Sequence, residues 1–127
     1  MKITLNPNAK DVATRDALVA EGGFGKYYTD HMVMCEWSEK DGWGEPHLMP
    51  YGPISLDPAT AVFHYGQEIF EGMKAYRQPD GSVALFRPTA NAKRFANSAK
   101  RLALPEMPVE LFMETVEALV KQDAGWV

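Results

Sequence analysis

Two arginines and a serine on one predicted helix have the types and spacing that could bind an anion. Arg94 and Arg101 are seven residues apart with Ser98 between them, so the three side chains lie on one helix face. A guanidinium presents its N–H groups in a fixed fork that matches the oxygens of a phosphate. The same pattern is typical of a solvated helix surface, which is the default interpretation. Periodicity alone leaves the anion site as the alternative.

A second group of side chains, all aromatic, could line an apolar pocket. Packing inside a hydrophobic core is nevertheless the default interpretation, because aromatic rings dominate the energetics of cores. Composition and spacing do not reveal which of the two applies. The aromatic residues are Phe24, Tyr65, Phe70 and Tyr76.

Metal and thiol chemistry has little support in the sequence. The histidines, His31, His47 and His64, are far apart and lack the spacing of metal ligands, so we expect structural histidines and no metal site. The single cysteine, Cys35, lies in an apolar run, where a thiol behaves as a small hydrophobic group. One cysteine cannot form an internal disulfide, which favours a reducing compartment.

Length and charge limit the classes of protein and partner. With 127 residues, of which 46% are hydrophobic and 24% charged, residues 1–127 have the size and composition of one globular domain. The net charge of −4 argues against nucleic acid as a partner. No apolar run approaches the ~18 residues of a membrane helix, and the N-terminus has no signal-peptide pattern. We therefore expect no membrane association and a cytoplasmic location.

The elements that must position these side chains begin with extended segments. Residues 30–37 are apolar on both alternating faces, which predicts a strand covered on both sides. Residues 41–44, with two glycines, predict a turn. Four prolines interrupt residues 46–58, so we expect irregular chain with short extended pieces around Met49 and Ile54.

A hairpin is the clearest prediction among the strands. Residues 73–77 and 83–87 flank a turn that contains Pro79 and Gly81. Proline presets φ for the second position of a turn, and glycine accepts the positive φ that such a loop requires. The two runs should therefore pair antiparallel.

Helical periodicity follows the hairpin. Apolar residues recur every three to four positions between Ala92 and Ala103 and again from Val109, which predicts two amphipathic helices. Residues 12–20 predict one or two helical turns near the N-terminus. Strands come first and the main helices afterwards, without βαβ alternation. The expected fold class is therefore α+β, with helices packed on a mostly antiparallel sheet.

Residues 63–76, FHYGQEIFEGMKAY, are similar to a segment of the branched-chain-amino-acid aminotransferases, which are fold-type IV pyridoxal-phosphate enzymes. Similar stretches lie on both sides in family order, so the resemblance covers about residues 22–127. The chain resembles the branch of the family with asparagine at position 91, where many fold-type IV members have histidine. The similar stretches are 24–26, 29–37, 42–44, 85–88, 91–95 and 98–102.

The resemblance implies roles for four residues and a set of partners. Arg94 matches the arginine that binds the phosphate of the cofactor, pyridoxal 5'-phosphate, which contradicts the solvated-face interpretation unless another domain closes over that face. Phe24, Tyr65 and Phe70 match residues of the substrate pocket, with Tyr65 serving the neighbouring subunit of a homodimer. The implied substrates are small molecules: leucine, isoleucine and valine, which pass their amino group to 2-oxoglutarate and yield glutamate and 2-oxo acids.

The resemblance also implies that part of the enzyme is absent. In the family, the lysine that holds the cofactor as a Schiff base lies in a larger C-terminal domain. None of the lysines of this chain matches that lysine, so we expect no catalytic residue within it. We therefore expect residues 1–127 to be a single, incomplete small N-terminal domain that is inactive without the catalytic C-terminal domain.

Two alternatives stay open. The chain could be a non-catalytic module that associates with other proteins through a sheet edge and the aromatic patch. It could also belong to another fold-type IV enzyme, D-amino-acid aminotransferase or aminodeoxychorismate lyase, although these lack the Phe-Glu-Gly-Met-Lys stretch. A reading frame that continues past Val127 and encodes a cofactor lysine would favour the aminotransferase, whereas a stop codon there would favour the module.

Overall fold

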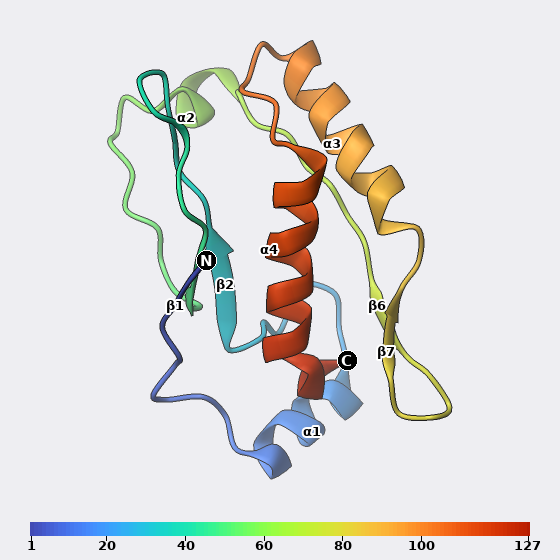
Figure 1. Ribbon diagram of the computed structural model, residues 1–127. Helices are drawn as coiled ribbons and strands as arrows, with labels where there is room; N and C mark the ends of the chain where they lie inside the picture. Colours follow the sequence, from blue (N-terminus) through green and yellow to red (C-terminus); the bar gives the residue numbers. More distant parts are fainter.

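Three small sheets and four α-helices make up the chain, and the computed structural model describes all 127 residues (Figure 1). In the three-stranded sheet, β1 (Lys2–Ile3) runs parallel to β5 (His47–Pro50), and β2 (His31–Met34) runs antiparallel to β5 on its other side. Helix α4 (Val109–Gln122) lies against β2 and β5, and α3 (Pro88–Arg101) packs beside α4. The predicted α+β class is confirmed, and the parallel pair of β1 and β5 is an addition to it.

Residues 30–37 do not form one continuous strand. β2 pairs with β5 so that Val33 lies opposite Leu48, whose side chain is fully buried. The chain then leaves this sheet, and β3 (Trp37–Ser38) pairs antiparallel with β4 (Gly42–Trp43). Because the Ser38 hydroxyl accepts the Asp41 N–H at 3.0 Å, the turn closes before β4. The turn predicted at 41–44 is therefore displaced toward the N-terminus, whereas β5 confirms the extended piece around Met49.

The predicted hairpin is confirmed, with shorter strands. β6 (Ala75–Arg77) and β7 (Val83–Leu85) pair antiparallel. Gly81 has a φ of 85°, which glycine adopts without strain, and its N–H donates to the Gln78 carbonyl at 2.9 Å to close the turn. β7 ends before the predicted residue 87 because Arg87 adopts a left-handed conformation, with a φ of 49°, from which α3 begins.

Local sequence signals explain where the helices begin. α1 (Val12–Glu21) begins after Asp11, whose carboxylate accepts a backbone N–H of the first turn at 2.8 Å. α3 has Pro88 in its first turn, where a helix leaves N–H groups unpaired in any case.

The short α2 (Ala61–Tyr65) is not among the predicted elements. None of the helices combines the length and the apolar character needed to cross a bilayer.

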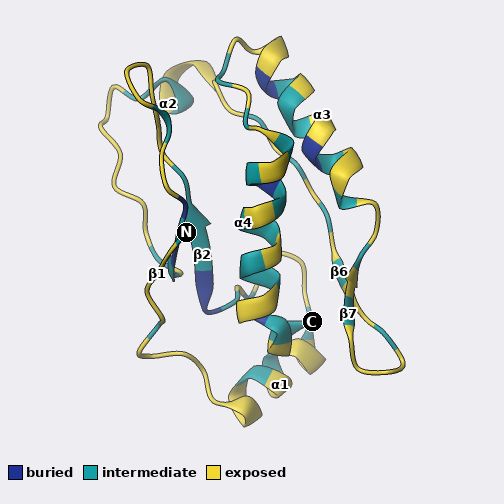
Figure 2. Cartoon of the chain, in the orientation of Figure 1, coloured by how far each residue is buried: buried dark blue, intermediate teal, exposed yellow.

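The hydrophobic core lies where α3 meets α4 (Figure 2), and it includes Leu48 of β5. α3 buries Ala92 and Ala99, and these small side chains let the two helices approach closely. The rings of Phe95 and Phe112 meet across the helix interface with their centroids 5.3 Å apart. The apolar faces predicted for both helices are therefore confirmed as packing faces.

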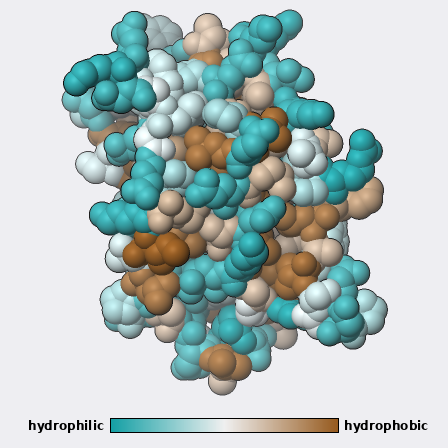
Figure 3. Space-filling view, viewed as in Figure 1, coloured by the Kyte–Doolittle hydropathy of each residue, from teal (hydrophilic) through white to brown (hydrophobic).

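The chain exposes more surface than a compact protein of its size. A compact monomer of 14.2 kDa exposes roughly 6,800 Å², whereas this chain exposes 9081 Å². Apolar groups lie open among hydrophilic ones on the face in Figure 3. Phe24, Tyr65 and Phe70 are 106%, 85% and 88% exposed, and Tyr76 is 49% exposed. The default interpretation that these rings pack in the core is therefore wrong: Phe24, Tyr65 and Phe70 are largely open to solvent, and Tyr76 is only half covered.

Candidate functional site

A buried carboxylate holds Arg94 on the surface of α3. The guanidinium donates from Nε to Glu71 Oε2 at 2.7 Å and from Nη2 to Glu71 Oε1 at 2.5 Å. The Glu71 side chain is only 5% exposed, whereas that of Arg94 is 67% exposed. Asn91, one helical turn before Arg94, donates its side-chain amide to Glu71 Oε1 at 3.0 Å. This paired, fork-like contact fixes the plane of the guanidinium.

Hydrogen bonds to Glu71 keep its carboxylate ionised. The pKa of Glu71 is lowered to about 2, first by the hydrogen bond from Arg94 and then by those from Asn91 and the Gly72 N–H, while burial acts in the opposite direction. The hydrogen bond to Glu71 also raises the pKa of Arg94. The structure therefore presents a permanent cation to solvent above a buried, ionised carboxylate.

A shallow depression of about 400 Å³ lies beside Arg94. Ser98 and Arg101 line it from the same face of α3, and Phe70 and Ile69 line it from the segment that follows α2. The Arg101 side chain and Arg94 Nη1 donate no hydrogen bond within the protein. The structure has features of both interpretations of this helix face. The arginines are solvated, as on an ordinary helix surface, and Arg94 is held rigidly with free N–H donors, as an anion site requires.

The structure brings together two of the four site residues predicted from the sequence. Arg94 and Phe70 line the same depression, whereas Phe24 and Tyr65 do not. Tyr65 is the last residue of α2, and Phe24 lies in the loop between α1 and β2. Both rings are open to solvent. Their roles in substrate binding stay predictions.

Glu71 and Asn91 are the members of this site that the sequence analysis assigned no role. Glu71 follows Phe70 in a largely apolar segment, and Asn91 stands three residues before Arg94 on the same helix. The available signal was an acid directly after Phe70, together with an amide one helical turn before an arginine. That signal does not reveal which cation the acid pairs with, because the approach of the two groups depends on how the β6–β7 hairpin brings α3 back beside residue 71.

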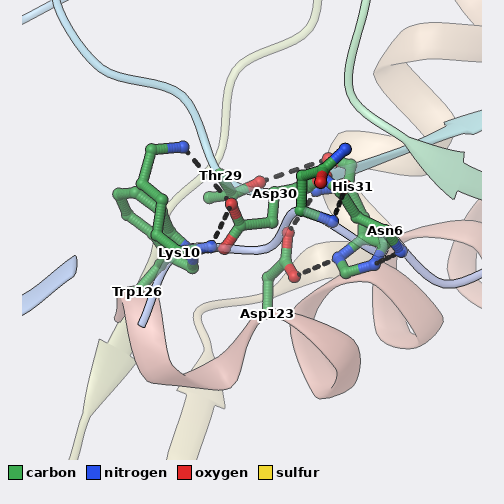
Figure 4. Close-up of polar contacts among 8 residues, drawn as sticks. Asn6, Lys10, Thr29, Asp30, His31, Asp123 and Trp126 are labelled. Carbon is green, nitrogen blue, oxygen red and sulfur yellow. Dashed lines mark hydrogen bonds and ion pairs between the residues drawn. The ribbon is translucent and has the colours of Figure 1, made fainter. Parts of the chain in front are cut away.

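A second polar cluster joins the N-terminal segment to the end of α4 (Figure 4). The His31 backbone N–H donates to Asp123 Oδ2 at 2.9 Å, and the ring Nδ1 lies 2.7 Å from Asp123 Oδ1. The Asn6 N–H donates to His31 Nε2 at 2.9 Å. Since Nε2 accepts a hydrogen bond, Nδ1 carries the ring proton and donates a hydrogen bond to Asp123 Oδ1. His31 is therefore a buried structural histidine, as its sequence context predicts.

Asp30 completes this cluster from the residue before β2. Trp126, in the short 3-10 helix η1 (Ala124–Trp126), donates its ring N–H to Asp30 Oδ2 at 2.9 Å. Lys10 Nζ lies 3.3 Å from Asp30 Oδ1 and 5.1 Å from the centre of the Trp126 ring. Burial raises the pKa of Asp30, but the hydrogen bonds from Trp126 and Lys10 outweigh it and lower the pKa overall. No buried side-chain polar atom of the chain lacks a partner, so the cluster holds structure together.

Curated relatives show the family. The chain is 55% identical over 127 residues to a probable branched-chain-amino-acid aminotransferase of Streptomyces coelicolor and 52% identical over 125 residues to a branched-chain-amino-acid aminotransferase of Mycolicibacterium smegmatis, and each comparison covers 98% of this chain. The chain belongs to the branched-chain-amino-acid aminotransferase family. A mitochondrial branched-chain-amino-acid aminotransferase of Saccharomyces cerevisiae is 46% identical over 97% of the chain. No family model matches the chain.

The chain spans about a third of the length of these aminotransferases: 35%, 34% and 30% of the three, in the order given. The identities to these aminotransferases confirm the family resemblance that residues 63–76 carry. The segment that carries it contains Glu71, and the one that follows the hairpin contains Asn91 and Arg94. The contacts around Arg94 are thus made by the aminotransferase-like segments of the chain.

Proposed function

We propose that this chain is the small N-terminal part of a branched-chain-amino-acid aminotransferase, an enzyme that moves the amino group of leucine, isoleucine or valine to 2-oxoglutarate. The observation that carries the proposal is the identity of 46% to 55% to three such aminotransferases over almost the whole chain. A catalytic domain that this chain lacks completes the enzyme. The exposed area beyond that of a compact monomer supports this view, since further polypeptide would cover it.

The side chains of this chain fit the phosphate of pyridoxal 5'-phosphate, the cofactor that we propose. Two of the five N–H groups of Arg94 bind Glu71, which leaves three for phosphate oxygens. Ser98 and Arg101 beside them add a hydroxyl and a second cation. When bound, the cofactor supplies the electron sink that amino-group transfer requires. Within this chain Arg94 would bind and orient the phosphate.

Aromatic side chains would supply the walls of the substrate pocket. Phe70 lies beside Arg94, where an apolar ring suits the side chain of leucine, isoleucine or valine. Phe24 is proposed for the same pocket, and Tyr65 for the pocket of the neighbouring subunit in a homodimer. The exposure of all three rings supports a role that another domain or subunit completes.

Absorbance spectroscopy of two proteins tests the proposed function. The full-length protein and residues 1–127 are each titrated with pyridoxal 5'-phosphate, and leucine is then added. We expect the full-length protein alone to develop a protein-bound cofactor band that shifts with leucine. Absence of that shift in the full-length protein would contradict the aminotransferase and favour a protein-association module, which also exposes apolar surface.

Arg94→Ala in the full-length protein tests the role of the arginine. Loss of a charge-assisted contact to phosphate should raise the Kd of pyridoxal 5'-phosphate at least about tenfold, whereas the preference among amino acids should change little. Arg87→Ala, which removes an arginine outside the depression, is the matched control. Equal cofactor retention by Arg94→Ala and the unsubstituted protein would exclude Arg94 as the phosphate anchor.

A further inference from the structure

The Glu71 carboxylate is the centre of a four-donor arrangement. Arg94 supplies two donors, Asn91 one at 3.0 Å, and the Gly72 N–H one at 2.9 Å. The Asn91 amide also donates to the Gly72 carbonyl at 3.0 Å, which anchors the segment to α3. The carboxylate is therefore fixed by the backbone and by the helix independently of Arg94.

The hydrogen bonds to Glu71 leave the opposite edge of the Arg94 guanidinium free. Nε and the N–H of Nη2 that faces Glu71 are used, so the N–H groups of Nη1 and the remaining one of Nη2 point away from the carboxylate. A long side chain that is 67% exposed would otherwise sample many rotamers. Glu71 thus selects one orientation before an anion arrives.

Two consequences of an acid next to an anion site can be distinguished. Glu71 could compete with a phosphate for Arg94, or it could hold Arg94 for the phosphate. Competition requires the two anions to use the same donors, whereas Glu71 occupies one edge of the fork and leaves the other open. The carboxylate is also 5% exposed and bound by Asn91 and Gly72, so it has other donors that neutralise it. The geometry therefore favours a Glu71 that holds Arg94 in place for the phosphate over one that competes with it.

We propose that Glu71, supported by Asn91, is a positioning residue that orients the Arg94 guanidinium toward the phosphate of a phosphorylated cofactor. This inference rests on the proposed function, because it requires Arg94 to bind that phosphate. Glu71 itself contacts neither the phosphate nor the reacting atoms. Its effect should therefore appear only with a ligand that carries the phosphate group.

The test compares two forms of vitamin B6 that differ in the phosphate. Apo forms of the full-length protein and its variants are titrated with pyridoxal 5'-phosphate and, separately, with pyridoxal. For Glu71→Gln we expect the Kd of pyridoxal 5'-phosphate to rise about tenfold, with the Kd of pyridoxal unchanged within about twofold. Glu68→Gln, the same chemical change on a nearby exposed residue, is the control. Asn91→Ala is the second variant, for use if Glu71→Gln does not fold. It should raise the Kd of pyridoxal 5'-phosphate in the same way but by a smaller factor.

Arg94→Ala separates a failure of this inference from a failure of the proposed function. In the Arg94→Ala background, Glu71→Gln should add no further loss of pyridoxal 5'-phosphate binding. If Arg94→Ala does not lower the preference for the phosphorylated form, the proposed phosphate-binding role of Arg94 is wrong and this inference falls with it, whereas the absorbance test with leucine still decides the aminotransferase. If Arg94→Ala lowers the preference for the phosphorylated form but Glu71→Gln does not, Glu71 has a structural role alone. The same holds if Glu71→Gln weakens the binding of both ligands equally. Tighter binding of pyridoxal 5'-phosphate by Glu71→Gln would show competition and overturn the inference.

Discussion

The polar cluster around His31 and the surface around Arg94 use charge in opposite ways. In the cluster, Asp30 and Asp123 are buried, and their partners come from both ends of the chain. Around Arg94 the carboxylate is buried, but the cation stands 67% exposed with free N–H groups. The cluster is complete within this chain. The Arg94 guanidinium, in contrast, keeps N–H groups that no acceptor of this chain binds.

Apolar side chains show the same contrast. Phe112 is 9% exposed and packs on Phe95, whereas Phe70 is 88% exposed beside Arg94. Exposed rings of this size are unfavourable unless another surface covers them. The comparison therefore divides the molecule into a part around α4, where aromatic side chains pack on one another, and a part beside Arg94, where an aromatic ring stays exposed.

One substitution made in both regions should give the largest difference. Phe112→Ala should lower the free energy of unfolding of the chain by about 3–5 kcal/mol, because it leaves a cavity between α3 and α4. Phe70→Ala, the matched control, should change it by less than about 0.5 kcal/mol, because the ring is exposed. Urea denaturation measures both values. Similar losses for the two variants would remove the distinction between the regions.

Breaking the buried cluster should give the next largest effect. Asp123→Ala removes the acceptor of the two hydrogen bonds that His31 donates and leaves two buried N–H groups, one of the backbone and one of the ring, unpaired. We expect a loss of about 3 kcal/mol in the free energy of unfolding. Glu117→Ala, on an exposed face of the same helix, should lose no more than about 0.5 kcal/mol. If Asp123→Ala is as stable as Glu117→Ala, the cluster does not hold the two ends of the chain together.

Lowering the pH should reduce the stability that the pairing of Glu71 with Arg94 contributes. The pKa of Glu71 in the folded protein is about 2, below its ordinary value of 4.5, so ionised Glu71 stabilises the folded state above about pH 4.5. This contribution falls as the pH drops from 4.5 toward 2. The stability difference between the protein and Glu71→Gln should therefore shrink over that range.

Salt provides the control for the acid experiment. The Arg94 side of the pair is largely exposed, so added salt should also reduce the difference at neutral pH. Denaturation midpoints at a series of pH values and salt concentrations measure both trends. A difference that grows toward pH 2 would contradict the pairing of Glu71 with Arg94.

Much of the local structure could be predicted from the sequence. The hairpin from 73 to 87 follows from its proline and glycine, and the apolar stripes of α3 and α4 follow from helical spacing. The sequence also indicated that Arg94 could bind an anion. Short elements were harder: α2 was missed, and the strand predicted over 30–37 is divided between β2 and β3, since a few residues carry too little periodicity.

What the sequence determined by itself was the type of each long element, the α+β class and the presence of a cation on one helix face. Only the tertiary structure decided that Glu71 meets Arg94, 23 residues away, and that His31 meets Asp123, 92 residues away. Periodicity describes neighbours along one element, whereas these contacts depend on how loops return separate elements to each other. For the same reason, the exposure of Phe70 became evident only once the chain was folded and no part of it covered the ring.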